Sequence, residues 1–156
     1  MKNYRIRLAK KTDAKLLWFW ANDSSVRYNS FNNSEIKWNQ HLKWFNGKLN
    51  SKNTRIWILE IDNKPVGQIR YDRVNLVKAE IDFSIDINFR GNNLGSSLLG
   101  LSSDSAFQML EVETLEGIVQ ENNYASIKAF LKAGYKKIDD KLIQNRKCII
   151  FHKLKT

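Results

Sequence analysis

The sequence has few of the residues that define several other protein classes. Its 156 residues include one cysteine, one proline and two histidines. A lone cysteine excludes an intramolecular disulfide framework, and one thiol with two imidazoles does not make a zinc cluster. The single proline and the lack of low-complexity runs indicate no linker. We therefore expect a single domain over residues 1–156 and no bound metal.

Long apolar runs are missing as well. No stretch approaches the ~18 residues of a membrane-spanning helix, and residues 1–13 lack the apolar region of a secretory signal. We therefore expect a cytoplasmic protein with no membrane partner. Cys148 lies in the apolar run 148–151, which favours a buried structural thiol over a nucleophile.

Positive charge is in excess, with a formal net charge of +10 at pH 7. The lysines and arginines are scattered rather than gathered in one block, and no aromatic–basic repeat accompanies them. We therefore expect no nucleic-acid partner. An anionic small molecule explains the charge equally well, because a basic field concentrates phosphorylated substrates.

The hydrophobic periodicity predicts a mixed α/β layer. The expected order is β-α-α-β-β-β-α-β-α-β-β, with about seven strands and four helices. Ser34 is the expected N-cap of the second helix. Strands are expected over 4–9, 55–62, 65–73, from 79 onward, 115–120, 135–138 and 146–154, and helices over 13–21, 35–49, 95–110 and 123–133.

The stretch from Ala79 to Leu99 carries the clearest chemical signal. Alternating apolar residues predict a half-buried strand, and residues 90–95 form a polar, glycine-containing turn before a helix. Unpaired N–H groups and the positive end of the helix dipole favour a phosphate there. The turn matches neither GxxxxGK[ST] nor GxGxxG, so it is neither an ATP-type P-loop nor a dinucleotide fingerprint. An ordinary β–α connection is the alternative.

Two motifs in this half of the chain resemble those of the GCN5-related N-acetyltransferases (GNAT family). The turn resembles motif A, R/Q-x-x-G-x-G/A, through Arg90, Leu94 and Gly95. Asn93 replaces the usual middle glycine, and asparagine tolerates positive φ. Residues 123–135 resemble motif B, N-x-x-[AS]-x-x-x-[YF]-x-x-x-G-[FY], at every fixed position. The resemblance implies the GNAT fold, with a mixed, mostly antiparallel sheet, and an N-acetyltransferase that uses acetyl-CoA.

The resemblance also implies which residues bind the coenzyme. The motif A turn would bind the pyrophosphate through backbone N–H groups, and the strand end at 85–87 would bind the pantetheine arm and the thioester. Asn123 would hydrogen-bond the pantetheine arm, and Ser126 and Phe130 would line the thiol end, with core packing as an equal alternative for Phe130. The full set is Ile85, Asp86, Ile87, Arg90, Gly91, Asn92, Asn93, Leu94, Gly95, Ser96, Asn123, Ser126 and Phe130.

Catalysis needs a group that takes a proton from the attacking amine. Glu80, which matches the general base of histone-type relatives, is the first candidate, and Asp82 is the second. Both lie on the polar face of one strand, where a solvated or salt-bridged face is the alternative. Many relatives place a general-acid tyrosine where Phe130 stands. Tyr124, Tyr135 or backbone N–H groups alone are therefore the candidates for stabilising the leaving thiolate.

The N-terminal half indicates the acceptor. Residues 20–49 resemble W-x-N-D-x-x-V-R-x-x-S-F…I…H-x-x-W-F…L, a pattern of acetyltransferases that act on nucleotide-linked amino sugars of pseudaminic and related nonulosonic acid synthesis. The resemblance implies a small-molecule amine partner, a nucleotide sugar, whose pyrophosphate would bind an arginine fork. The candidate acceptor residues are Asn22, Asp23, Arg27, His41, Gln68 and Arg70.

Each acceptor residue has a structural alternative. Asn22 and Asp23 could cap a turn, and His41 could be a satisfied, half-buried histidine. Two other functions stay open: an N-terminal acetyltransferase of the ribosomal-protein type, and a non-catalytic binding module with this fold. An exposed strand edge near the C-terminus could pair with a second copy to form a homodimer.

Overall fold

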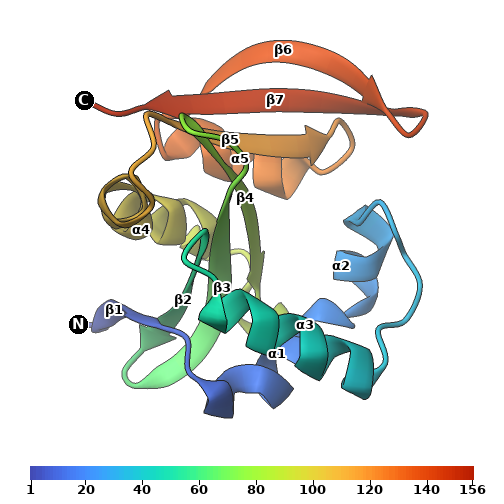
Figure 1. Cartoon of the computed structure of the whole chain (residues 1–156), viewed down its shortest axis with the longest axis vertical. Coiled ribbons are helices and arrows are strands. Elements are labelled where there is room, and N and C mark those ends of the chain that lie inside the picture. The colour runs from blue at the N-terminus through green and yellow to red at the C-terminus, as the bar shows by residue number, and fades with distance from the viewer.

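The strands form one continuous sheet in the computed structural model, which describes residues 1–156 (Figure 1). Neighbouring strands are antiparallel except β4 and β5, which are parallel. The mixed, mostly antiparallel sheet of the GNAT fold is thereby confirmed. The strands are β1 Tyr4–Leu8, β2 Thr54–Ile61, β3 Lys64–Arg73, β4 Lys78–Ile85, β5 Thr114–Gln120, β6 Lys136–Ile143 and β7 Arg146–Leu154, and their order in the sheet is β1-β2-β3-β4-β5-β7-β6.

The chain has five α-helices, one more than the sequence predicted. They are α1 Ala14–Ala21, α2 Ser24–Asn29, α3 Trp38–Asn50, α4 Leu94–Leu110 and α5 Tyr124–Lys132. The additional helix is α2, which begins because the Asp23 side chain accepts hydrogen bonds from the N–H groups of Ser25 and Val26. None of the five is long and apolar enough to cross a membrane.

Two further predictions of element bounds were wrong. Ser34 does not cap the second predicted helix, because the residue before the helix is Lys37, which has an extended backbone, and α3 begins at Trp38. The strand predicted over 135–138 is the longer β6, which pairs along its length with β7 as a hairpin at the sheet edge. Its residues are exposed as far as Leu142. This open edge is where the predicted homodimer contact would form.

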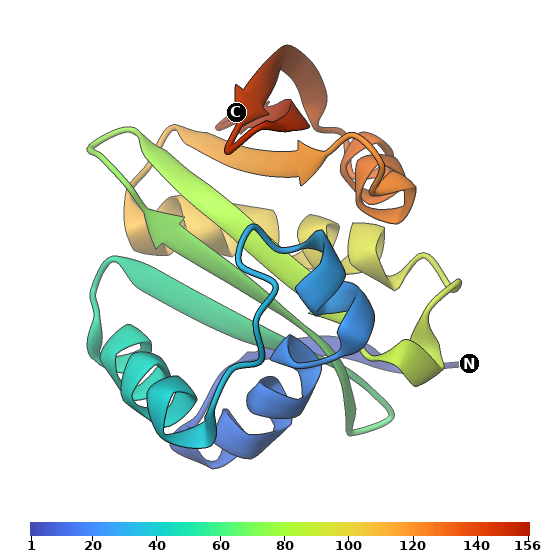
Figure 2. The ribbon, with the colours of Figure 1, turned by 90° about the vertical axis from the view of Figure 1, so that its right-hand side faces the viewer.

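Each face of the sheet packs against a different set of helices (Figure 2). On one face, Trp57 and Leu59 of β2 belong to a core of 19 buried residues under α4 and α5. On the other face, Ile56 and Ile58 belong to a core of 6 buried residues with α1 and α3. The alternation of β2 side chains therefore explains why helices cover both faces.

Strands β4 and β5 separate part of the way along their length. Their pairing ends at Ile81 and Gly117, although β4 continues to Ile85 and β5 to Gln120. The ring of Phe130 from α5 lies at this point: a Cβ on Gly117 would be 2.3 Å from its Cζ. Only glycine leaves room for the ring here, and the gap between the two strands opens immediately beyond it.

Candidate active site

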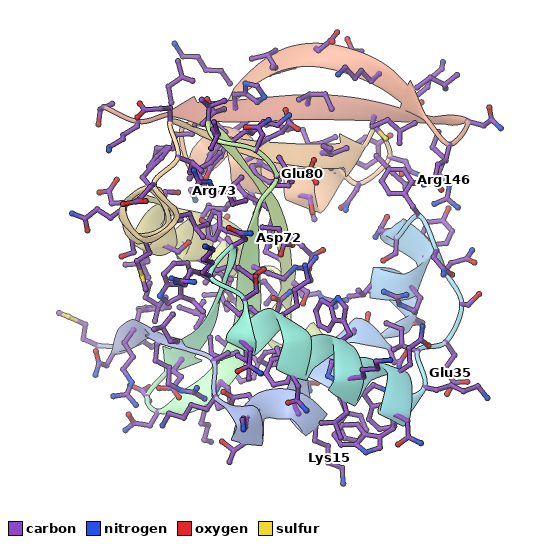
Figure 3. All side chains as sticks on the ribbon, viewed as in Figure 1. Lys15, Glu35, Asp72, Arg73, Glu80 and Arg146 are labelled. Carbon is purple, nitrogen blue, oxygen red and sulfur yellow. The ribbon has the colours of Figure 1, made fainter.

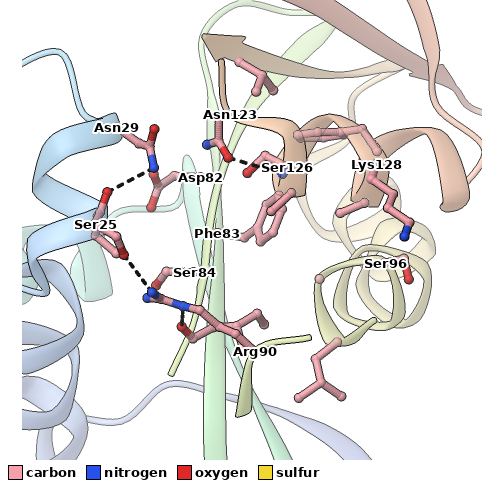
Figure 4. A pocket seen from close by; sticks show the side chains of 18 of the residues that line it. Ser25, Asn29, Asp82, Phe83, Ser84, Arg90, Ser96, Asn123, Ser126 and Lys128 are labelled. Carbon is pink, nitrogen blue, oxygen red and sulfur yellow. Dashed lines mark hydrogen bonds between the residues drawn. The ribbon is translucent and has the colours of Figure 1, made fainter. Parts of the chain in front are cut away.

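A cleft of about 580 Å³ occupies the gap between β4 and β5. One side is formed by α2 and the residues that follow it, and the other by residues 90–96 and α5 (Figure 4). Its floor contains Phe83 of β4 and Phe130 of α5. A cleft of this size, with an apolar floor and polar rims, is typical of a site for a small molecule.

The turn before α4 presents a run of unused hydrogen-bond donors to this cleft. The backbone N–H groups of residues 91–96 make no hydrogen bond within the chain, and no side chain caps the helix. Gly91 has φ +84° and Asn93 has φ +59°, so asparagine does adopt the left-handed conformation expected of the missing glycine. The donors and the dipole of the 17-residue helix α4 together form an anion-binding surface.

Gly95 allows α4 to begin close to its neighbours. A Cβ at this position would lie 2.9 Å from Cε2 of Phe83 and 3.2 Å from Cβ of Ala129. A larger residue would push the start of α4 away from both β4 and α5. The glycine of motif A is therefore required for packing as well as for access to a ligand.

Most of the residues predicted to bind the coenzyme line the cleft, and three do not. Asp86 instead accepts a hydrogen bond from the Trp20 indole at 2.9 Å, which joins α1 to the end of β4. Ile87 is exposed on the outside, and the Asn92 side chain donates to backbone carbonyls of its own turn. The residues brought together at the cleft are Ile85, Arg90, Gly91, Asn93, Leu94, Gly95, Ser96, Asn123, Ser126 and Phe130.

Asn123 both caps α5 and remains available to a ligand. Its Oδ1 accepts a hydrogen bond from the N–H of Ser126 at 3.3 Å, and its Nδ2 has no partner in the chain. Phe130 is 2% exposed and stacks on Phe151 with ring centroids 5.3 Å apart. Phe130 is thus packed in the core and also borders the cleft.

Two lysines at the cleft were missed by the sequence analysis. Lys128 and Lys132 of α5 line its α4 side, and Lys128 extends toward Ser96 (Figure 4). Neither forms an ion pair. Their spacing could have indicated them, because both lie within motif B and are one helical turn apart. They add positive charge beside the unused N–H groups.

Asp82 is the carboxylate that lies in the cleft. It is the first residue of β4 beyond the pairing with β5. Gln68 Nε2 donates to its Oδ2 at 3.2 Å, and Arg70 Nη1 is 3.7 Å from the same oxygen. The structure therefore brings one predicted catalytic residue together with two of the predicted acceptor residues.

Glu80 lies outside the cleft, on the paired part of β4. Its neighbours in register are Asp72 on β3 and Glu116 on β5 (Figure 3). Arg70 of β3 contacts carboxylates on both strands: its Nε donates to Asp72 of β3 at 2.6 Å, and its Nη1 lies near Asp82 of β4. Burial by itself would lower the pKa of Arg70, but the charges of Asp82 and Asp72 raise it above its ordinary value.

The other predicted acceptor residues hold the chain around α2 in place. Asn22 makes two hydrogen bonds of 2.8 Å with the backbone of Ile36. Asp23 caps α2 and pairs with Arg90 at 3.2 Å. Burial raises the pKa of Asp23, but hydrogen bonds from Ser25 and Arg90 outweigh it and lower the pKa. Neither residue lines the cleft.

Arg27 and His41 are also used internally. Arg27 donates to the carbonyls of Ala21 at 2.7 Å and Asn32 at 2.9 Å. Burial lowers the pKa of Arg27, opposed by the charge of Asp82. His41 is 2% exposed, its Nε2 lies 2.8 Å from the carbonyl oxygen of Ala14, and burial lowers its pKa. His41 is thus a satisfied core histidine.

No tyrosine lines the cleft. The hydroxyl of Tyr135 lies 3.0 Å from Ser103 Oγ inside the core, and burial raises the pKa of Tyr135. Tyr124 is 77% exposed on the outside of α5. Ser126 of α5, which carries a hydroxyl group, does line the cleft.

Comparisons with known proteins identify the family and the fold. A family model described as an acetyltransferase (GNAT) domain matches residues 4–136. A search of curated proteins finds no match. Among solved structures, spermidine N-acetyltransferase from Vibrio cholerae, in complex with CoA and spermine, is 14% identical, with a TM-score of 0.87 over 97% of this chain and 95% of that one.

Two more solved structures share the fold. Aminoglycoside acetyltransferase AAC(6')-Ib, in complex with coenzyme A and kanamycin, is 15% identical, with a TM-score of 0.82 over 97% of this chain and 95% of that one. A domain from Methanocaldococcus jannaschii is 22% identical, with a TM-score of 0.83 over 99% of each chain. The family model covers most of the sequence, and the chain therefore belongs to the GNAT family of acetyltransferases.

Proposed function

We propose that this GNAT acetyltransferase transfers the acetyl group of acetyl-CoA to a primary amine of a small molecule by direct attack in a ternary complex. The observation that carries the proposal is the composition of the cleft. At one end it has the unused N–H groups of residues 91–96, and at the other the carboxylate of Asp82. An anionic cosubstrate and an amine could thus meet between β4 and β5.

Groups that suit the phosphates and the pantetheine arm of acetyl-CoA line the cleft. The donors of residues 91–96, with Lys128 and Lys132, suit its phosphates. Beyond Ile81 the edge of β4 that faces β5 has no strand partner, and such an edge can pair with the amides of a pantetheine arm as it would with a strand. Asn123 Nδ2 supplies a further donor.

Each residue of the cleft would have a defined chemical task. Acetyl-CoA supplies an activated acetyl group as a thioester. Asp82 would accept the proton of the substrate ammonium, so that the nitrogen lone pair can attack the carbonyl carbon and the C–S bond can break. N–H groups on the free edge of β4 would hold the carbonyl oxygen while its negative charge develops. Ser126 would donate a hydrogen bond to the departing thiolate, which takes up the second proton that the nitrogen loses, so that the products are the amide and free CoA thiol.

For the acceptor we propose a nucleotide-linked amino sugar. The pattern of residues 20–49 supports this choice. Gln68 and Arg70 do not line the cleft, but both contact Asp82 and so place polar groups next to the carboxylate that does. A cationic amine is the second candidate. It is favoured by a different observation: Glu80 and Asp82 lie on the same face of β4, and Glu80 has no basic partner in the chain.

Thermal denaturation followed by an acceptor panel tests the proposal. Acetyl-CoA should raise the melting temperature, because a ligand that binds only the folded state stabilises it. Release of free thiol is then measured with a UDP-linked amino sugar, spermidine, kanamycin and a peptide with a free N-terminus. Turnover of the UDP-linked amino sugar alone would support a nucleotide sugar as the acceptor. Turnover of spermidine or kanamycin would favour a cationic amine. An unchanged melting temperature with acetyl-CoA would refute the donor site.

A further inference from the structure

The segment formed by α2 and the two residues after it, residues 24–31, is held at both ends by residues from distant parts of the sheet. At its start, Arg90 donates to Ser25 Oγ at 2.6 Å and to Asp23 Oδ1 at 3.2 Å. Arg90 follows the end of β4, so this contact fixes the start of α2 to one of the two separated strands.

At its other end the segment is fixed to the second strand and its neighbour. Gln120, the last residue of β5, donates through Nε2 to the carbonyl of Asn29 at 2.9 Å. Arg146, the first residue of β7, donates through Nη1 to the carbonyl of Ser30 at 2.8 Å, and its guanidinium lies 5.8 Å from the centroid of the Phe31 ring. Figure 3 shows Arg146 beside α2. We call these contacts of Gln120 and Arg146 the bridge.

The bridge separates two hollows. Asn29, Ser30 and Gln120 line the cleft. Gln120 also lines a second hollow of about 380 Å³ outside it, together with Arg146 and Tyr28. Because Gln120 borders both, the partition is about one side chain thick. Without the bridge, the cleft would continue into the outer hollow.

We infer that Gln120 and Arg146 are positioning residues that close the cleft at this end and thereby restrict the acceptor to amines short enough to end inside it. The inference rests on the proposed function and adds a specificity determinant to it. Both side chains act through backbone carbonyls of residues 29 and 30, so they fix the position of the segment without needing a particular sequence there. A peptide, whose chain continues far beyond its N-terminal amine, could not end inside the closed cleft and would be excluded.

Competition between amines of different length tests the inference. The wild type and the variants Arg146→Ala, Arg146→Lys and Gln120→Ala receive acetyl-CoA with equal amounts of ethanolamine, diaminobutane, spermine and a nonapeptide amide, and products are counted by mass spectrometry. Lys147→Ala is the matched control, because it removes the neighbouring charge and leaves the bridge intact. We expect the wild type to acetylate the short amines, ethanolamine and diaminobutane, in preference to the nonapeptide.

In Arg146→Ala the ratio of nonapeptide to short-amine product should rise about tenfold, the effect of losing about one charge-assisted hydrogen bond. Arg146→Lys, which can still donate, should show a smaller rise, and Lys147→Ala none. A ratio unchanged in both Arg146→Ala and Gln120→Ala would overturn the inference, as would a wild type that acetylates the nonapeptide as readily as the short amines.

Hydrogen exchange supplies a second readout that needs no acceptor. Amides of residues 24–31 should exchange about tenfold faster in Arg146→Ala, while those of β5 and β7 keep their protection. Unchanged exchange in this segment would overturn the inference even if no amine in the mixture reacts. Failure of acetyl-CoA to raise the wild-type melting temperature would instead overturn the proposed function, so the two failures are distinguishable.

Discussion

The two sides of the cleft use their polar groups in opposite ways. On the donor side, residues 90–96, the backbone N–H groups have no partner in the chain and face the cleft. On the acceptor side, residues 21–37, the side chains of Asn22 and Arg27 bind backbone carbonyls of the same segment, and Asp23 caps α2 and pairs with Arg90 of the donor side. The donor side therefore presents unpaired backbone groups to the cleft, whereas the side chains of the acceptor side hold their own segment in place.

The largest effect that we predict concerns the carboxylate between the two sides. Asp82→Asn should lower kcat by about 10²–10⁴, the usual contribution of a positioned general base. Glu80→Gln, two residues away on the same face of β4, should lower it less than tenfold, because Glu80 lies outside the cleft. Steady-state kinetics of both variants decide which carboxylate is the general base. A larger loss of kcat in Glu80→Gln would assign that role to Glu80 instead of Asp82.

Loss of Asn22 should damage the acceptor side alone. Asn22→Ala removes two hydrogen bonds to the backbone of Ile36 and should lower the free energy of unfolding by about 2 kcal/mol, at about 1 kcal/mol for each bond. We expect KM for the amine to rise while KM for acetyl-CoA stays the same. Equal rises in both constants would contradict the division into two sides.

Gly95→Ala should damage the donor side alone. The added methyl would lie 2.9 Å from the Phe83 ring and move the start of α4, so the dissociation constant for acetyl-CoA should rise about tenfold, equivalent to ~1.4 kcal/mol. Gly100→Ala is the matched control in the same helix, since nothing lies within 4 Å of its added Cβ. Calorimetric titration should find wild-type affinity in the control, and equal affinity in both variants would refute the role of Gly95.

The smallest effect that we predict is a pH dependence of the free energy of unfolding, caused by His41 in the core beneath the acceptor side. Burial lowers the pKa of His41 in the folded state, so below the unfolded value of about 6.5 the unfolded chain binds more protons than the folded one. Stability should therefore fall as the pH drops below about 6.5, by at most ~1.4 kcal/mol per pH unit for this one group. His41→Gln, which can still donate to Ala14 but does not titrate, should remove this slope in urea unfolding between pH 7 and 5. If the variant keeps the same pH dependence of stability, a group other than His41 is responsible for it.

Local patterns predicted the conformation of the turn on the donor side better than the arrangement of the acceptor side. Gly91 and Asn93 have positive φ, and Gly95 packs closely against its neighbours. Each of these constraints acts on a single residue, so a sequence motif can indicate it. Helix α2 has six residues, too few for a hydrophobic period, so the residues that it places in the cleft were missed.

Long-range partners account for the remaining differences. His41 is bonded to Ala14, 27 residues away, and no local pattern indicates that contact. Asp82 and Glu80 are equivalent in the sequence, because both lie on one strand face. They differ only because the pairing of β4 with β5 ends at Ile81, and that end point depends on the ring of Phe130 against Gly117.

The most direct test of the central claim, that acetyl-CoA binds through the unused N–H groups before α4, is a titration followed by the backbone amide resonances of the labelled protein. The largest shifts should occur at residues 91–96, with smaller ones along β4 from residue 82 to residue 85 and at Asn123. Shifts confined to other parts of the chain, or no shifts at saturating acetyl-CoA, would contradict the account.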